Sequence, residues 1–547
     1  MAKEKDKSLT LEDILWECRV ALRGVGSLDK NRDAVISLVF LKFAGDKFAR
    51  CREQVMRQFG DNPAFLENPA FYNAENVFYL KETARWDYIV RRAGQNDIAI
   101  VIDKAMADIE ADNETLAGAL SKNLFSTLGA DRSKIKSLID SVNRIDESRF
   151  HEDDLIGRVY EYFLQIYAAS GTKENGEFYT PACIVKLIAE LLEPFDGVVY
   201  DPCCGSGGMF VQSMKFVDRH NGNRDKVSII GQESVQETWR LCKMNLAIRG
   251  IAHDLGKTNA STFTGDQHKD MKVDYIMANP PFNLKNWRTE KELAGDARWS
   301  GYCGQQSAPR VSNANYAWIL HMISKLDVSR GVAGFLLANG ALGDMDDWEI
   351  RRNILLKDRV EAIIVLPRDM FYTTDISVTL WIVAMNKRAG TINGRKVRGR
   401  EREILFMDLR AWDGNVEEIV IDKRKRKRKK KTVLTDSQIA KIKETYNNWQ
   451  SEDRTLYHDE PEFCKSVKVL ERDLTEEEAK SGAVTVEGQN WALMPSKYID
   501  FIDHDMDIDY RAEMRRIQAE MAELVRRERE SQEQLTAAFR GIGYGIE

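Results

Sequence analysis

One stretch of the chain decides the fold: Val198-Val199-Tyr200-Asp201-Pro202-Cys203-Cys204-Gly205-Ser206-Gly207-Gly208. Its first three residues predict a short buried strand, and the small residues after Asp201 let the backbone leave that strand in a sharp turn. A helix that begins after such a turn presents free N–H groups to a ligand. The spacing is neither the GxGxxG of dinucleotide sites nor that of a P-loop. We therefore expect a ligand-binding turn of another kind.

The same alternation of strand and helix continues on both sides of this stretch. Further strands are expected at 227–231, 275–277, 332–337, 362–366, 378–384 and 404–407. Helices are expected at 155–168 and 181–192, joined by a loop at 171–180. Strands separated by helices predict a largely parallel sheet covered on both faces. Such sheets bind ligands at the carboxyl ends of their strands, so functional side chains are expected there.

The flanking regions read differently. The amino-terminal part is helical, beginning with Thr10 as a helix cap and Asp13 in the first turn, and it contains a dense apolar stretch at 35–43. Near the carboxyl terminus, apolar residues follow an a/d spacing that Glu528 and Ser531 interrupt. These apolar positions are Met514, Ile517, Met521, Leu524, Leu535 and Ala538. The predicted organisation is a helical domain (1–150), an α/β domain (151–410), a basic loop with a mixed helical segment (411–505) and a carboxyl-terminal helix (506–547).

Composition indicates a folded globular chain. Its 547 residues are 43% hydrophobic and 30% charged, and no apolar run is long enough to span a membrane. The net charge of −6 hides nine consecutive basic residues at 423–431. An acidic total does not exclude nucleic acid, because binding depends on local potential. The eight cysteines show neither a CxxC pair nor a Cys/His cluster at zinc spacing, which favours a reduced, metal-free, cytoplasmic protein.

A second motif, Asn279-Pro280-Pro281-Phe282, follows the expected strand at 275–277. Its two prolines fix the backbone and remove two donors, which leaves a rigid corner with outward carbonyls. The Asn279 side-chain oxygen and the Pro280 carbonyl can together accept the two hydrogens of an exocyclic amine. Phe282 offers a flat face on which a planar base can stack. The corner therefore predicts a site that holds an amino group for reaction.

The glycine turn followed by Asn-Pro-Pro-Phe resembles the amino-methyltransferases that use S-adenosylmethionine. The segments 154–162 and 176–181 (Gly-Glu-Phe-Tyr-Thr-Pro) and the helical start at 15–43 resemble, more narrowly, the modification (M) subunit of type I restriction–modification systems. The motif order is that of gamma-class N6-adenine DNA methyltransferases. The resemblance extends to about residue 410. It implies an α/β, Rossmann-like S-adenosylmethionine-dependent methyltransferase domain with an N-terminal helical domain and a C-terminal helical extension.

The resemblance also implies roles for individual residues. Asn279, Pro280, Pro281 and Phe282 would form the catalytic corner, and no metal is expected. Glu233 would bind the ribose hydroxyls of the cofactor and Asp266 would lie near its adenine, although either acid could instead be a surface residue or a helix cap. The implied cofactor-binding set is Glu177, Phe178, Tyr179, Thr180, Pro181, Asp201, Cys203, Cys204, Gly205, Gly207, Glu233 and Asp266.

Cys203 and Cys204 depart from the usual small residues at their positions. A Pro-Cys pair is also found in cytosine C5 methylases, which need a cysteine nucleophile. Those enzymes place the cysteine after a different strand and have no use for an Asn-Pro-Pro-Phe corner. We interpret both cysteines as small packing residues of the turn.

The function implied is methyl transfer from S-adenosylmethionine to the N6 amine of an adenine flipped out of double-stranded DNA. A separate specificity (S) subunit would choose the sequence, with two M chains per S subunit, and a restriction (R) subunit would complete the system. The helix at 510–540 is the expected contact with S. The run at 423–431 is either a solvated loop or a phosphate-contacting loop. Alternative acceptors are a glutamine amide in a release factor or a base in structural RNA, and a scaffold without turnover is a third reading.

Overall fold

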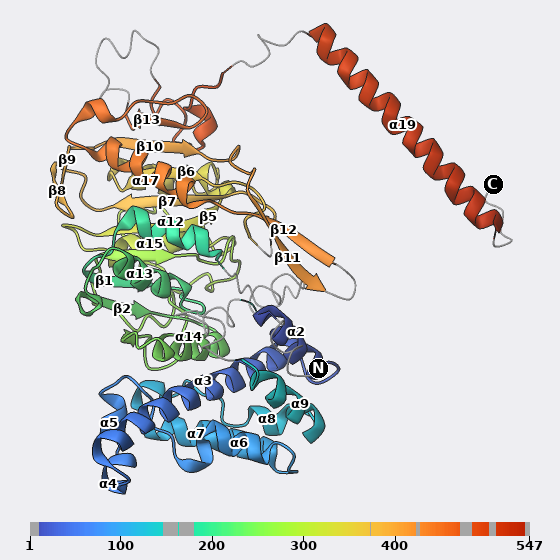
Figure 1. Cartoon of the computed structure of the whole chain (residues 1–547). Helices are drawn as coiled ribbons and strands as arrows, with labels where there is room; N and C mark the ends of the chain where they lie inside the picture. Colours follow the sequence, from blue (N-terminus) through green and yellow to red (C-terminus); the bar gives the residue numbers. More distant parts are fainter. Residues whose placement is uncertain are drawn as a thin grey trace. The chain divides into compact units, whose positions relative to one another are not determined.

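The structure is a computed structural model of the whole chain (Figure 1). It describes residues 10–145, 162, 180–371, 374–422, 427–470, 484–502 and 510–541. The chain forms two compact units, Met1–Ile499 and Asp500–Glu547. The expected helix at 155–168 and the loop at 171–180 lie almost entirely outside the described residues.

The amino-terminal region is helical, as its apolar spacing predicts. Thr10 caps the first helix: its Oγ accepts from the Asp13 N–H at 3.2 Å and its own N–H donates to the Asp13 carboxylate at 3.0 Å. Such a cap stabilises a helix by about 1 kcal/mol. The dense stretch at 35–43 is buried within the helical core. The α-helices are α2 (Leu11–Ala21), α3 (Leu28–Phe59), α4 (Pro63–Leu66), α5 (Pro69–Asn73), α6 (Trp86–Arg92), α7 (Ile98–Asp112), α8 (Leu124–Thr127) and α9 (Arg132–Val142).

A nine-stranded sheet forms the centre of the larger unit, in the order β13-β10-β6-β7-β5-β4-β1-β2-β3. All seven strands expected from the sequence are present. The order reverses at β1, because β2 and β4 pair with its two edges, so the carboxyl ends of these strands flank a crevice. The strands are β1 (Gly197–Asp201), β2 (Val227–Gly231), β3 (His253–Asp254), β4 (Tyr275–Ala278), β5 (Val332–Ala338), β6 (Val360–Val365), β7 (Val378–Ala384), β10 (Glu403–Asp408) and β13 (Cys464–Lys468).

The sheet is mixed, although mainly parallel. β7 runs antiparallel to both β5 and β6, and β13 runs antiparallel to β10. β6 reaches β7 without the crossover helix that a parallel pair requires, so the chain returns in the opposite direction. The expectation of an α/β fold is confirmed, with these two strands as the exceptions.

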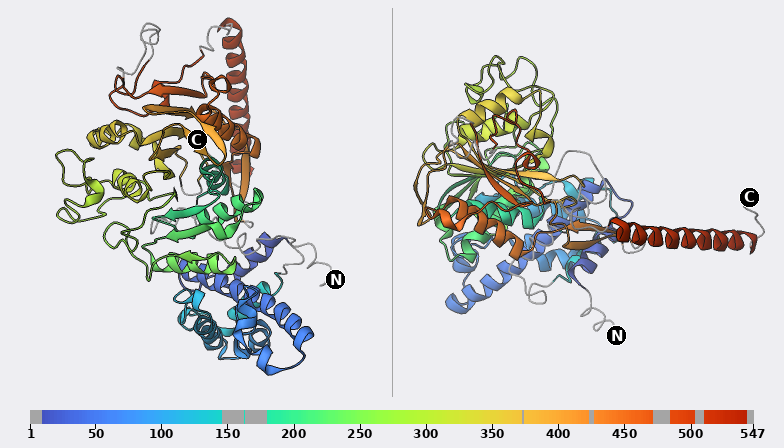
Figure 2. Two further views of the ribbon diagram at one scale, coloured as in Figure 1. Left: turned by 90° about the vertical axis from the view of Figure 1, so that its left-hand side faces the viewer. Right: turned by 90° about the horizontal axis from the view of Figure 1, so that it is seen from above.

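Helices cover both faces because alternate strand residues point to opposite sides. Val199 of β1 packs with one core cluster and Tyr200, its neighbour, with the other. The left view of Figure 2 shows a helical layer on each side of the sheet. The helices are α12 (Ala182–Leu192), α13 (Gly208–Arg219), α14 (Gln236–Ile248), α15 (Asn315–Lys325), α16 (Trp348–Leu356) and α17 (Asp436–Gln450).

Within residues 411–505, the described part of the basic run is a strand and not the loop expected for it. β11 (Val416–Asp422) and β12 (Lys427–Thr432) pair as an antiparallel ribbon, and β13 joins the main sheet. A run of charges has no apolar alternation, so the sequence alone does not predict a strand here. The strand β12 forms because the acidic strand β11 pairs with it and offers charges of opposite sign. The predicted domain boundaries at 150, 410 and 505 stay predictions. A further small ribbon consists of β8 (Gly390–Ile392) and β9 (Arg395–Val397).

Short 3-10 helices complete the secondary structure: Glu82–Ala84, Glu114–Leu116, Arg224–Lys226, Ala297–Trp299, Asn339–Leu342, Arg454–Leu456 and Pro495–Lys497.

The helix α14 joins the helical region to the sheet. Its residues Leu241 and Met244 belong to the amino-terminal core, whereas Cys242 and Leu246 pack in the core beneath the sheet. The Lys243 ammonium also donates to the carbonyl of Ala117 at 2.7 Å. One helix is therefore shared by two hydrophobic cores.

The second unit contains α19 (Tyr510–Gly541), a single helix of 32 residues. Its apolar side chains at Met514, Met521 and Leu524 are exposed. Of the helices that the structure describes, none combines the length and the apolar character needed to cross a membrane.

Candidate active site

The glycine turn leaves β1 and starts α13, as the sequence predicts. Gly205 and Gly207 have φ angles of 53° and 82°, a region that favours glycine. A Cβ on Gly207 would lie 2.9 Å from the Cys242 sulfur, so the turn packs closely against α14. Among the residues that the structure describes, a Cβ on Gly205 would meet no atom within 4 Å. The turn is therefore tight on one side and open on the other, which leaves space for a ligand above Gly205.

Two acids lie at adjacent strand ends beside this turn. Asp201 is 2% exposed and accepts from the Cys203 N–H at 3.0 Å. Glu233, just past β2, accepts from the N–H groups of Gly205 at 3.0 Å and Val235 at 2.9 Å. Burial raises the pKa of Asp201 to about 7, and the Glu233 carboxylate adds to this rise. Burial also raises the pKa of Glu233, although its backbone donors oppose the rise. Both carboxyls would be easier to ionise beside a bound cation or donor.

The two cysteines of the turn are poor nucleophiles. Burial and the neighbouring Asp201 carboxylate raise the pKa of the Cys203 thiol well above its usual value. A hydrogen bond with Cys242, together with burial, raises the pKa of Cys204. Only the thiolate attacks, so neither side chain is prepared for covalent catalysis. Cys204 is buried in one hydrophobic core and Cys203 packs against the other, which supports the packing role expected for both.

Asn279 stands at the carboxyl end of β4 and has one end of its amide fixed. Its Nδ2 donates to the Thr180 hydroxyl at 2.9 Å. Its Oδ1 is buried and, among the residues that the structure describes, has no hydrogen-bond partner. A buried acceptor without a donor costs about 1–3 kcal/mol unless a ligand satisfies it. The orphaned oxygen therefore marks where a donor is expected to bind.

The rest of the corner is Pro280, Pro281 and Phe282, of which Phe282 meets a second aromatic ring. Pro280 is buried, and Phe282 is partly buried. The ring of Phe371, fully buried in the connection from β6 to β7, meets the Phe282 ring edge-on, with centroids 6.2 Å apart and an angle of 77°. Phe371 was not among the predicted site residues, because only the folded sheet brings it to Phe282.

A pair of asparagines holds the corner from behind and was also missed. Asn283 follows Phe282 in the left-handed region, with φ of 54°. Its N–H donates to the Asn315 Oδ1 at 3.0 Å, and the Asn315 Nδ2 donates back to the Asn283 Oδ1 at 2.9 Å. Asn315, at the start of α15, is only 2% exposed. An asparagine just after the Pro-Pro-Phe segment is a signal for the left-handed conformation, which asparagine adopts more readily than most residues, but its partner is 32 positions away.

The remaining predicted residues lie in three situations. Asp266 forms an ion pair with Lys325 at 2.7 Å; burial alone would raise its pKa, but the Lys325 bond and charge lower it. Pro181 directly precedes α12. Glu177, Phe178 and Tyr179 lie outside the described residues. The cofactor contacts of all of these stay predictions.

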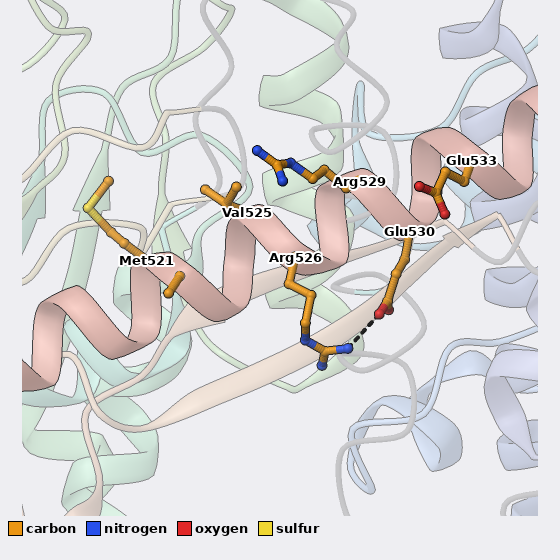
Figure 3. Close-up of a pocket in the computed structure, with 7 residues that line it drawn as sticks. Met521, Val525, Arg526, Arg529, Glu530 and Glu533 are labelled. Carbon is orange, nitrogen blue, oxygen red and sulfur yellow. Dashed lines mark hydrogen bonds and ion pairs between the residues drawn. The ribbon is translucent and has the colours of Figure 1, made fainter.

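Elsewhere the described residues offer no competing centre. Within them, no three His, Cys, Asp or Glu side chains gather as a metal site would require. The hollow in Figure 3 lies on a single helix, α19, and is the open flank of that helix rather than a substrate cavity. It is lined by Met521, Ala522, Val525, Arg526, Arg529, Glu530 and Glu533.

The mainly parallel sheet, the glycine turn at its switch point and the Asn-Pro-Pro-Phe corner together define a Rossmann-like amino-methyltransferase. The profile named N-6 DNA Methylase matches residues 151–482, and the profile named HsdM N-terminal domain matches residues 11–142. The chain belongs to the type I restriction–modification methylase subunits, as the motifs predicted. It is an N6-adenine DNA methylase, the modification subunit of such a system.

Individual relatives are similar to this chain in sequence or fold over most of its length. The type I restriction enzyme HindI methylase subunit of Haemophilus influenzae is 35% identical over 457 residues, which cover 82% of this chain and 93% of that protein. A methyltransferase subunit from Streptococcus thermophilus shares the fold with a TM-score of 0.68 at 22% identity, over 90% of this chain and 99% of that one. A chain from a study of type I complex assembly gives a TM-score of 0.53 at 18% identity, over 96% and 97%.

Proposed function

We propose that the corner at Asn279, Pro280 and Phe282 holds the amine of an adenine flipped out of duplex DNA, and that the glycine turn beside it binds S-adenosylmethionine. The observation that carries the proposal is the buried Asn279 Oδ1, which lacks a partner among the described residues while Thr180 holds the other end of the amide. When bound, S-adenosylmethionine supplies an activated methyl group.

The chain's own residues then act by positioning. The Asn279 Oδ1 and the Pro280 carbonyl accept the two amine hydrogens, which turns the nitrogen lone pair toward the methyl group. Flipping the base costs a few kcal/mol, and stacking on Phe282 returns on the order of 1–3 kcal/mol. No strong base is needed, because the proton leaves late and positioning supplies most of the rate.

The cofactor site is built from the two strand-end acids and the turn. Glu233 accepts hydrogen bonds from the ribose hydroxyls, a role for which an acid just after the second strand is well placed. Asp201 lies beneath the methionine end, where its negative charge favours a cationic ligand. The open space at Gly205 fits a bound molecule of this kind. The segment from Glu177 to Pro181 covers the methionine end, and Asp266 contacts the adenine of the cofactor.

The assembly comprises two copies of this chain, one S subunit that reads the sequence and an R subunit. The apolar stripe of α19 supports a contact with S, because exposed apolar residues along one face of a helix gain stability by packing on a partner helix. Among the described residues of this stripe, Met514, Met521 and Leu524 are each more than half exposed.

Transfer of label from S-adenosylmethionine to unmethylated DNA tests the proposal. The chain is assayed alone and after coexpression with its S subunit. Label in adenine only when S is present supports both the acceptor and the division of labour. Label in adenine from the chain alone keeps the acceptor and removes the separate reader. Label absent from DNA in both assays contradicts the proposal and directs the search to protein glutamine or RNA.

A further inference from the structure

The basic run does not form an irregular loop where the structure describes it. Lys427–Thr432 is the strand β12, which pairs antiparallel with β11, and Figure 1 shows the two as a ribbon beyond the main sheet. In the register, Glu418 lies opposite Lys430 and Val420 opposite Arg428. The run therefore displays its charges at fixed intervals along a strand.

Two carboxylates at the ribbon, Glu418 and Asp375, are each shared by two cations. Glu418 pairs with Arg428 at 2.7 Å and with Lys430 at 3.7 Å. Asp375 pairs with Lys431 at 3.0 Å and with Lys429 at 3.5 Å. One carboxylate cannot neutralise two cations, so the group of Glu418, Arg428 and Lys430 keeps a net positive charge.

The two groups differ in exposure. The side chains of Arg428 and Lys430 are 63% and 73% exposed, whereas Lys431 is 2% exposed. Exposed ion pairs contribute little to stability, so an incoming anion can replace Glu418 at little cost. The Lys431 pair instead fastens the ribbon to the body of the protein.

The residues that attach the ribbon to the body of the protein contact the same connection that supports the catalytic corner. Asp375 belongs to the connection between β6 and β7, and the Thr432 N–H donates to the Asp369 carbonyl of the same connection at 3.0 Å. This connection also carries Phe371, which packs edge-on against Phe282. The base of the ribbon is therefore attached to the segment that supports the base-stacking residue.

We propose that the β11–β12 ribbon is an arm that binds the phosphate backbone of the substrate duplex, with Arg428 and Lys430 as its contacts. The proposal rests on the proposed function, in which the substrate is duplex DNA. Alternate residues of an antiparallel strand lie about 6.8 Å apart, twice the roughly 3.4 Å axial spacing of charges on one DNA strand. Contacts of this kind are independent of sequence and set the register of the duplex on the protein.

The double variant Arg428→Gln/Lys430→Gln tests the arm in the full chain, coexpressed with S. Binding of a labelled 30-base-pair duplex is measured across a range of salt concentrations. Each lost phosphate contact makes the negative slope of log K against log salt shallower by about 0.9. The double variant loses two contacts, so its slope is expected to be shallower by about 1.8. The matched control is Arg57→Gln/Arg91→Gln, which removes two exposed arginines of the helical domain, each paired with one carboxylate.

Glu418→Gln gives a test of opposite sign. Removing the shared carboxylate frees both cations, so DNA binding is expected to tighten, while the salt slope, which counts phosphate contacts, stays as in the wild type. S-adenosylmethionine affinity should be unchanged in all of these variants, which checks that they fold.

The arm is ruled out if the double variant keeps the wild-type slope or if the control loses as much. Loss of copurification with S at an unchanged DNA slope overturns it in favour of a protein contact. Failure of the wild-type complex to methylate DNA at all would instead contradict the proposed function, before any variant is compared.

Discussion

The two ends of the Asn279 side-chain amide are in different environments: one is held by a hydrogen bond, and the other can accept one from a ligand. Thr180 holds its nitrogen, and its oxygen is buried with no partner among the described residues. Behind it, Asn283 and Asn315 exchange two hydrogen bonds that fix the backbone after Phe282. A network of neutral amides needs no charge compensation, so it fixes the backbone of the corner without burying a charge there.

Replacing Asn279 or Phe282 by alanine should separate chemistry from cofactor binding. Asn279→Ala is expected to lower methyl transfer on the order of 100-fold or more, because the amine is no longer oriented. Phe282→Ala should lose about 10- to 100-fold, in keeping with about 1–3 kcal/mol of stacking, and Phe282→Tyr should restore most of it. S-adenosylmethionine affinity, measured by calorimetry, should survive. Equal loss of cofactor binding in both alanine variants would mean that the corner belongs to the cofactor site.

Asp201 should make cofactor binding depend on pH. Its pKa of about 7 in the folded protein lies above the ordinary value of 3.8. Between about pH 7 and pH 4 the folded chain therefore holds a proton on Asp201 that the unfolded chain does not, and the free energy of unfolding rises as pH falls through this range. A cationic ligand prefers the ionised form, so affinity for S-adenosylmethionine should rise about tenfold between pH 6 and 8. Asp201→Asn keeps the acceptor for Cys203 and should flatten this rise. A pH profile that is equally steep in the variant would assign the dependence to another group.

At the scale of single elements, α19 has two distinct faces. Met514, Ile517, Met521 and Leu524 recur at spacings of three and four, whereas Arg526 forms ion pairs with Glu523 and Glu530 on another face. The exposed ion pairs keep the polar face in water. The apolar face is left for a partner.

Truncation after residue 505 is expected to abolish copurification with S while leaving S-adenosylmethionine binding intact. Met521→Glu/Leu524→Glu should have the same effect, because it places charges in the apolar contact. The matched control, Glu523→Ala/Glu530→Ala, alters the polar face and should still copurify. If the truncated chain or the Met521 and Leu524 variant bound S normally, α19 would not be the contact.

For the whole molecule, the decisive feature is that α14 belongs to two cores. It begins three residues after Glu233, and Leu241 and Met244 extend it into the helical domain. A ligand held by Glu233 should therefore stabilise both regions together.

S-adenosylmethionine at about 100 times its Kd should add about 2.7 kcal/mol to the free energy of unfolding. In scanning calorimetry, the residues before 500 are expected to unfold in one transition that moves upward as a whole with ligand. Asp201→Asn offers a variant with weaker binding, in which the shift should shrink. Two transitions, of which only one responds to the ligand, would show that the helical domain unfolds independently.

Local patterns accounted for much of the fold and site. The alternation of buried strand residues such as Val199 and Tyr200, and the cap at Thr10, are properties of neighbouring residues and can be recognised without tertiary contacts. The glycine turn and the Asn279 corner are likewise short segments with their own backbone requirements. β12 was missed because its pattern is charge, and charge forms a strand only opposite Glu417 and Glu418.

The sequence by itself determined the class of protein, the order of its motifs and the position of the glycine turn and of the Asn279 corner after two strands, because each depends on a few adjacent residues. Only the tertiary structure decided what surrounds them: Thr180 on Asn279, Asn315 on Asn283, Phe371 on Phe282 and Asp375 on the basic ribbon. In each of the hydrogen-bonded pairs, the two residues are 32 to 99 positions apart in the sequence. Such contacts arise from the packing of whole strands and helices, and no local pattern encodes them.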